Sequence, residues 1–170
     1  MEHLWAPWRM AFIASKTPQS EPQACIFCAK PAADRDAENY ILYRGTYCFM
    51  MLNIYPYNNG HLMIAPYQHI ATAEDLDAAT LTELMTQAQL ALRALRLVMQ
   101  PDGFNMGVNE GKVAGAGFAD HVHLHIVPRW QGDTNFMPVI ADVKVMPELL
   151  DDVYQKLKQA LETLKDDQSH

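Results

Sequence analysis

The chain has 170 residues, enough for one domain with a buried core, and 49% of them are hydrophobic while 19% are charged. Its formal net charge is −7, from 20 acidic and 13 basic side chains, which argues against sequence-independent binding to nucleic-acid phosphates. No apolar run reaches the length of a membrane span, and the start MEHLWAPWRM lacks the apolar region of a secretory signal. We therefore expect a cytoplasmic protein with no membrane partner.

Residues 1–39 are expected to form an amino-terminal arm followed by a loop that carries a cysteine pair. Residues 4–14 suit a short helix or an apolar arm, and residues 15–39 are polar and contain three prolines. Cys25 and Cys28 form a CxxC pair, and Cys48 makes an odd total, which does not suggest a disulfide framework. A CxxC pair alone is compatible with a metal site, a redox motif or coincidence. The redox motif needs a preceding strand, which is not expected here, so the pattern favours a metal site.

The pattern of residues 40–147 predicts one α+β domain built on a mostly antiparallel sheet of about five strands. The gaps between the first strands are short, which is typical of antiparallel neighbours. A capping-box-like Thr72–Asp75 precedes an apolar stripe that predicts a long helix over residues 73–100, closed by Pro101. The expected strands are 40–43, 47–52, 61–65, 104–108 and the segment around 121–126, and the stripe comprises Leu81, Leu84, Met85, Ala88, Leu92, Leu95 and Met99.

Residues 148–170 are expected to form a C-terminal helix and a frayed tail, after a mostly irregular stretch over 131–146. Pro147 suits the first turn of this helix because proline lacks the N–H that a first turn leaves unpaired. Its apolar face is formed by Leu150, Val153, Tyr154, Leu157, Leu161 and Leu164.

The most informative motif is His-Val-His-Leu-His at residues 121–125. Alternation with apolar residues predicts a strand with one apolar face and one imidazole face. Residues two apart on a strand are separated by about 6.6 Å, and residues four apart by about 13 Å. A Zn–N bond is only about 2.0 Å, so a single metal cannot bind all three histidines. We therefore expect His123 and its two neighbours to have different roles.

A glycine-rich segment, GVNEGKVAGAGFAD, directly precedes these histidines at residues 107–120. It is not a dinucleotide-binding fingerprint, which follows a strand and opens a helix, and it lacks the Gly-Lys-Ser/Thr of a P-loop. It is either an ordinary turn or an anion site in which backbone N–H groups bind phosphate oxygens.

The histidine motif in this context resembles the histidine triad (HIT) superfamily of nucleotide hydrolases and transferases. The resemblance extends to LNIYPYNNGHLMIAP upstream and to VPRW and GDTNFMPV downstream, over roughly residues 40–147. The wider pattern, with AGAG before the triad, PRW after it and WAPWRM at the start, looks most like the bacterial branch that includes diadenosine tetraphosphate phosphorylases.

The resemblance implies a role for individual residues. His123 would be the nucleophile on the α-phosphorus of a nucleotide, and His125 would hydrogen-bond the phosphate or the leaving group. Gly117 stands where many relatives carry Ser or Gln, so a side-chain donor is missing there and the second acceptor stays open. The substrate site would be formed by Asn53 and His61 at the nucleoside, Asn109 at the ribose or phosphate, and backbone groups near Gly115 and Gly117 at the phosphates.

The resemblance also implies partners for the CxxC pair. Some relatives bind zinc through such a pair, a histidine after a Pro-x-x-His-like stretch, and the first triad histidine. The alternative is that the two cysteines are ordinary packed thiols. The corresponding set here is Cys25, Cys28, His69 and His121, two thiolates and two imidazoles that suit tetrahedral structural zinc.

The resemblance therefore implies an enzyme that cleaves dinucleoside polyphosphates by phosphorolysis or hydrolysis, and Lys112 and Arg129 are candidate phosphate-binding cations. A nucleoside phosphoramidase and a nucleotide-binding regulatory module are the alternatives. We expect a nucleotide substrate, structural zinc without an organic cofactor, no nucleic-acid partner, and a homodimer or a larger homo-oligomer.

Overall fold

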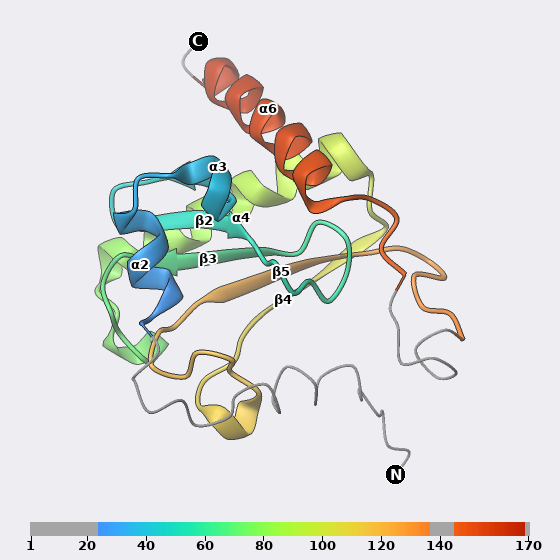
Figure 1. Ribbon diagram of the computed structural model, residues 1–170. Helices are drawn as coiled ribbons and strands as arrows, with labels where there is room; N and C mark the ends of the chain where they lie inside the picture. Colours follow the sequence, from blue (N-terminus) through green and yellow to red (C-terminus); the bar gives the residue numbers. More distant parts are fainter. Residues whose placement is uncertain (1–23, 137–144, 169–170) are drawn as a thin grey trace.

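Five strands form the centre of the fold in the order β1-β2-β3-β5-β4, as seen in a computed structural model that describes residues 24–136 and 145–168 (Figure 1). Every neighbouring pair is antiparallel. The predicted α+β class and its mostly antiparallel sheet are therefore confirmed. The strands are β1 (Ile41–Arg44), β2 (Cys48–Leu52), β3 (Leu62–Pro66), β4 (Gly103–Val108) and β5 (Leu124–Arg129).

The sheet is covered on both faces. Side chains alternate across a strand, so in β2 Met50 faces one core while Phe49 and Met51 face another. The larger core includes residues of the helices α4 (Ala78–Met99) and α6 (Leu150–Gln168), and the smaller one includes Phe27 of α2 (Ile26–Ala32). In Figure 1, α2 lies in front of the strands and α4 runs behind them.

The segment expected to be a loop around the CxxC pair is helical instead. Cys25 is the N-cap of α2, and a second short helix, α3 (Asp36–Asn39), follows. Arg44 of β1 holds both helices, because its Nη2 donates to the carbonyl of Pro31 at 2.9 Å and to the Asp36 carboxylate at 2.7 Å. Tertiary contacts of this kind override the proline and the polar composition that indicated a loop. Residues 4–14 lie outside the described residues.

The long helix begins later than predicted. Residues 73–75 form a 3₁₀ turn, η2 (Ala73–Asp75), and Asp77 caps α4 by accepting from the Thr80 N–H at 2.7 Å. Leu81 and Met85 of the predicted stripe are 40% and 52% exposed. The buried face lies further round the helix, where small and polar residues fit closely against the sheet: Thr80, Leu84, Gln87, Ala88, Ala91, Ala94 and Leu95.

Helix α6 packs on α4 and β1 through the predicted apolar face, which includes Val153, Tyr154 and Leu157. It begins at Leu150, three residues after the expected Pro147, and extends to Gln168. Part of the stretch expected to be irregular, residues 137–144, lies outside the described residues. Within residues 24–136 and 145–168, no helix is long and apolar enough to cross a membrane.

Candidate active site and metal centre

The histidine motif lies at the start of β5, but the strand is shorter than predicted. β5 begins at Leu124, so His125 lies in the strand while His121 and His123 precede it. The register of β3 and β5 would place Val122 opposite Pro66, and proline has no N–H to continue the ladder. The Val122 N–H instead donates to the carbonyl of Ile70 at 2.7 Å.

The predicted alternation of faces holds despite the shorter strand. Val122, Leu124 and Ile126 belong to the larger core behind the sheet. His123 and His125 face the opposite way, toward the α2 side, with their ring centroids 4.6 Å apart. The face of the sheet that carries α2 is therefore also the face that carries the triad.

His123 is held in one tautomer by its own backbone. Its Nδ1 lies 2.9 Å from the carbonyl oxygen of His121. A carbonyl only accepts, so Nδ1 carries the proton and donates it, which leaves Nε2 with a lone pair. Burial lowers the pKa of His123, and the hydrogen bond to the His121 carbonyl opposes this in part. The imidazole is therefore neutral, with Nε2 as a nucleophilic nitrogen.

His125 is oriented by a chain of three groups. The backbone N–H of Tyr57 donates to Nδ1 of His61 at 3.0 Å, so Nδ1 of His61 is an acceptor and its proton lies on Nε2. Nε2 of His61 donates to Nδ1 of His125 at 2.9 Å. By the same argument the proton of a neutral His125 lies on its Nε2, which makes that nitrogen a donor. His61 itself is 1% exposed and lies behind His125.

His121 has the opposite tautomer to His123. Its Nε2 donates to the carbonyl of Pro66 at 2.9 Å, so Nδ1 carries the lone pair. That nitrogen lies 3.4 Å from Sγ of Cys25 and 3.7 Å from Sγ of Cys28. Burial lowers the pKa of His121, which keeps the imidazole neutral, the form that binds a metal.

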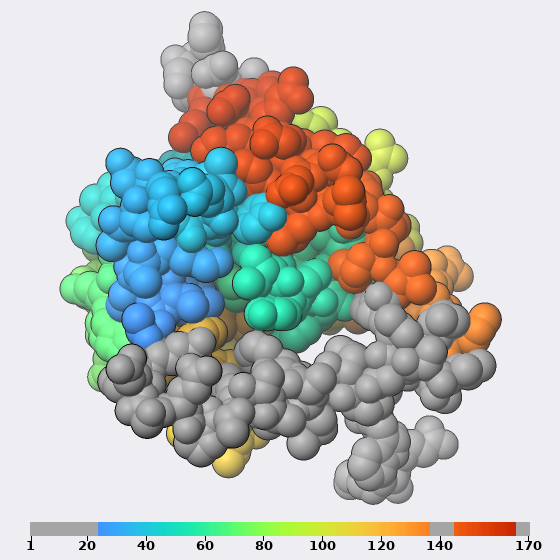
Figure 2. All heavy atoms as spheres, in the orientation of Figure 1, coloured from blue at the N-terminus to red at the C-terminus, as the bar shows by residue number. Residues whose placement is uncertain are grey.

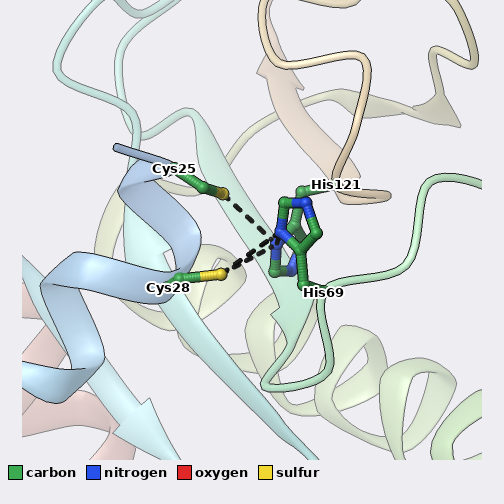
Figure 3. A group of neighbouring side chains, drawn as sticks. All are labelled: Cys25, Cys28, His69 and His121. Atoms are coloured by element: carbon green, nitrogen blue, oxygen red, sulfur yellow. Dashed lines mark hydrogen bonds between the residues drawn. The ribbon is translucent and has the colours of Figure 1, made fainter. Parts of the chain in front are cut away.

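His69 completes a group of four side chains that could bind a metal ion. Its Nδ1 lies 3.3 Å from Nδ1 of His121 and 3.3 Å from Sγ of Cys28. In Figure 3 the two sulfur atoms, from the start of α2, and the two imidazoles converge on one point. All four ligand atoms lie within 4.8 Å of one another.

The spacing of these atoms fits a tetrahedral ion. Bonds of about 2.0 Å to nitrogen and about 2.3 Å to sulfur at tetrahedral angles separate two nitrogens by roughly 3.3 Å, and a nitrogen from a sulfur by roughly 3.5 Å. The observed separations of 3.3 Å and of 3.3–3.7 Å match these values. Two sulfurs and two nitrogens at these separations could hold a tetrahedral metal ion such as zinc.

The glycine-rich segment forms a turn beside the triad. Lys112–Ala114 is a 3₁₀ turn, η3, flanked by Gly111 and Gly115 at φ of 75° and 87°, values that favour glycine. The N–H of Gly115 donates to the carbonyl of Lys112 at 3.0 Å, so an anion would have to replace that bond. Upstream of this turn, Glu110 accepts from the Ala73 N–H at 2.7 Å and holds the half-buried Asn109 segment against η2.

Asn53 begins the loop that carries Tyr57 and His61. Its Oδ1 accepts from the Tyr55 N–H at 2.9 Å, and its Nδ2 lies 3.4 Å from Nδ1 of His61. Figure 2 views the face on which this loop, drawn in teal, lies between α2 and α6. Asn53 thus lies next to the pair of hydrogen-bonded imidazoles, His61 and His125.

Arg129 does not lie with the other candidate phosphate ligands. It is six residues from His123 along an extended segment, roughly 20 Å. Its guanidinium pairs with Asp133 at 2.6 Å and donates to Asn105 at 2.7 Å. Arg129, the last residue of β5, therefore holds the turn that follows the strand through Asp133.

Two residues at the site were not singled out by the sequence. Phe27, inside the CxxC pair, places its ring centroid 4.5 Å from that of His123. Tyr57 sets the tautomers through its N–H and stacks its ring on His125 at 5.7 Å. An aromatic residue between two candidate metal ligands was the one available signal for Phe27. The role of Tyr57 depends on a backbone group, which the sequence does not display.

Comparisons with known proteins point to one family. The HIT domain family matches residues 34–132. An AP-4-A phosphorylase of Mycobacterium tuberculosis is 40% identical over 92% of this chain and 83% of its own. An adenosine 5'-monophosphoramidase of Saccharomyces cerevisiae is 32% identical over 66% of each chain.

A solved structure gives the same fold. A zinc-bound histidine triad family protein from Mycobacterium smegmatis superimposes with a TM-score of 0.67 at 28% identity, over 84% of this chain and 96% of its own. The family match spans more than half of the chain and includes all three triad histidines. The chain belongs to the histidine triad family of proteins, and with its phosphorylase relative it is an enzyme of that family.

Proposed function

We propose that this protein cleaves dinucleoside polyphosphates such as diadenosine tetraphosphate at the α-phosphorus, through a nucleotidyl-histidine intermediate on His123. The observation that carries the proposal is the bond between Nδ1 of His123 and the His121 carbonyl, because it leaves Nε2 as a buried lone pair beside a second imidazole. The similarity to an AP-4-A phosphorylase supports the substrate class.

In the first step, Nε2 of His123 attacks the α-phosphorus and forms a P–N bond. The bond from phosphorus to the bridging oxygen breaks, and the leaving nucleoside polyphosphate can take the Nε2 proton of His125. The His121 carbonyl accepts the hydrogen bond from Nδ1 throughout, so it stabilises the imidazolium that forms. His61 acts through His125 and need not touch the nucleoside.

In the second step, an acceptor oxygen attacks the same phosphorus and the P–N bond breaks. With inorganic phosphate as acceptor, diadenosine tetraphosphate yields ATP and ADP; with water it yields ATP and AMP. The acceptor's proton returns to Nε2 of His125, which restores the starting state. Gly117 offers no side chain to position a water molecule, and the phosphorylase relative supports phosphate as the acceptor.

We propose that the remaining substrate contacts come from two loops. Asn53 lies beside the imidazole chain at the nucleoside end, and Asn109, Gly115 and Gly117 lie in the segment before the triad. For Gly115, phosphate binding requires exchange of its bond to Lys112.

We also propose that Cys25, Cys28, His69 and His121 bind one structural zinc ion. The convergence of two sulfurs and two imidazole nitrogens supports this, as does the zinc-bound family member from Mycobacterium smegmatis. When bound, the ion would hold α2 and the loop of His69 against the triad segment. No organic cofactor is needed for the steps above.

The experiment that tests this function is product analysis with and without phosphate. Purified protein is incubated with diadenosine tetraphosphate in buffer that contains or lacks inorganic phosphate, and the nucleotides are separated by chromatography. We expect faster cleavage with phosphate and ATP plus ADP as products. AMP formed at one rate in both buffers would identify a hydrolase instead.

A second candidate function is cleavage of nucleoside phosphoramidates. The hydrogen bonds from the Tyr57 N–H to His61 and from His61 to His125 favour this function, because they leave a proton on Nε2 of His125. An amine leaving group needs such a proton more than a polyphosphate does. The relative from Saccharomyces cerevisiae is named for such an activity. Adenosine phosphoramidate in the same assay distinguishes the two: a higher kcat/KM than for diadenosine tetraphosphate would reverse our ranking.

A further inference from the structure

We infer that Phe27 is a positioning residue for the nucleophile His123, and that the metal centre acts on catalysis through this ring. The inference deepens the proposed function and rests on its assignment of His123 and of zinc.

The first observation is the packing around His123. The Phe27 ring lies over the His123 ring with centroids 4.5 Å apart and planes 31° apart, and it also lies 5.2 Å from His121. His125 lies edge-on to His123 at 67°. Three contacts therefore restrain the His123 ring. Phe27 covers one face, His125 packs edge-on, and the His121 carbonyl accepts a hydrogen bond from Nδ1.

The second observation is the place of Phe27 in the chain. It lies between Cys25 and Cys28 in the first turn of α2, where the N–H groups of Cys28 and Ala29 both donate to the Cys25 carbonyl. A rigid turn of this kind moves as one unit. Metal binding at the two sulfurs therefore also sets the position of the Phe27 ring against His123.

The third argument is the charge that develops in the reaction. Attack by Nε2 converts the neutral imidazole of His123 into a cation. A cation within about 6 Å of an aromatic centroid is attracted by the ring face. Phe27 thus restrains the neutral ring before the attack and faces the charged ring after it.

The matched control for Phe27 is Phe49. Both side chains are almost fully buried in the same smaller core, at 1% and 0% exposure. Phe49 stacks on Tyr67 at 5.4 Å instead of on a triad histidine. Phe27→Leu and Phe49→Leu remove the same atoms from the same core, so both should lower Tm to a similar extent.

The kinetic test compares these two variants in the zinc-loaded protein. For Phe27→Leu we expect kcat to fall about tenfold to a hundredfold with KM nearly unchanged, because small misplacements of a reacting group are costly. For Phe49→Leu we expect kcat to stay close to wild type. Equal losses of kcat in both variants, or none in Phe27→Leu, would overturn the inference.

A spectroscopic test works without turnover, so it separates this inference from the proposed reaction. Protons over an aromatic face resonate upfield, so the ring protons of His123 should move downfield in Phe27→Leu and stay in place in Phe49→Leu. Unmoved His123 resonances in folded Phe27→Leu contradict the stack, whichever substrate the enzyme uses.

A chelation experiment tests whether the metal centre affects His123 through Phe27. Removing zinc should shift the His123 resonances in the wild type and shift them less in Phe27→Leu, where the ring that transmits the change is missing. Such non-additivity is the signature of coupled groups. Equal shifts in both proteins would mean that zinc reaches His123 by another route. If Phe27→Leu does not fold, the test uses the wild type and Phe49→Leu. We expect zinc removal to shift the His123 resonances in both proteins, and unshifted resonances would reject the link between the metal and His123.

Discussion

At the scale of single residues, backbone groups decide what each histidine can do. The carbonyls of His121 and Pro66 and the N–H of Tyr57 neither gain nor lose protons in the working pH range. They therefore fix directly which imidazole nitrogen donates and which accepts in His123, His121 and His61, and they act on His125 through His61. These tautomers suit the roles that we propose: a nucleophile at His123, a metal ligand at His121 and a proton donor at His125.

The first prediction concerns His123, the proposed nucleophile. We expect His123→Ala to lower kcat at least a thousandfold, which corresponds to roughly 4 kcal/mol of barrier. Nucleotide binding, measured by titration calorimetry, should survive because the change leaves the two substrate loops intact. A variant that keeps more than a tenth of the wild-type rate would remove His123 from this role.

The second prediction concerns His61, which is buried behind His125. His61→Phe should lower kcat by about a hundredfold, near the lower end of the effect of a general acid. The loss should be larger for a phosphoramidate than for diadenosine tetraphosphate, because only the amine must be protonated to leave. The ratio of the two losses is the measurement, and a ratio of one speaks against a proton path through His61.

At the scale of elements, the four candidate metal ligands come from three separate segments of the chain. Cys25 and Cys28 come from α2, His69 from the loop after β3, and His121 from the segment before β5. A site assembled from three segments contributes its binding free energy to the fold, because it does not exist in the unfolded chain.

The third prediction removes the two sulfur ligands. Cys25→Ser with Cys28→Ser should abolish zinc binding, measured by elemental analysis, and should lower Tm by several degrees. Cys48→Ser serves as the control and should leave the zinc content at one per chain. A double variant with unchanged Tm would show that the cysteines are ordinary packed thiols.

Thiol chemistry gives a fourth prediction at the same scale. Burial, with Glu83 and Asp77 nearby, raises the pKa of Cys48 to about 12, so this thiol is unreactive in the folded protein. An alkylating reagent at pH 8 should label Cys25 and Cys28 after chelation and Cys48 only after unfolding. Peptide mapping reads the labelled positions. Rapid labelling of Cys48 in the native protein contradicts its burial.

Periodicity predicted the elements well where local pattern and burial agree. The strands and α6 were found because their apolar residues repeat at 2 or about 3.6 residues. The CxxC segment was mistaken for a loop because α2 depends on Arg44 and on the burial of Phe27, contacts from outside its own sequence. The four candidate metal ligands were expected from the resemblance and lie close together, whereas the Phe27 stack and the Tyr57 N–H required the fold.

At the scale of the whole molecule, β4 leaves one edge of the sheet without a strand partner among the described residues. Met106 and Val108 on this strand are 40% and 37% exposed. An exposed strand edge with apolar side chains can pair with another chain. We propose that the expected homodimer forms across β4. From the sequence, only the resemblance to the family indicated a dimer, and it did not indicate which surface forms the interface.

The fifth prediction tests that interface. Met106→Lys with Val108→Lys should convert a dimer to a monomer in sedimentation, with the helical circular dichroism unchanged. Leu149→Lys, at a residue that is 73% exposed just before α6, is the control and should stay dimeric. A wild-type protein that sediments as a monomer rejects the proposal outright.

The most direct test of the account is to trap the nucleotidyl-enzyme. Without phosphate the second step should slow, so an adenylyl group should accumulate on the protein after mixing with diadenosine tetraphosphate. The reaction is quenched without acid, because acid breaks the P–N bond of the adduct. Peptide mass mapping is predicted to place it on His123, with one ATP released per adduct and no adduct in His123→Ala. ATP released without any protein adduct, or an adduct on another residue, would contradict the account.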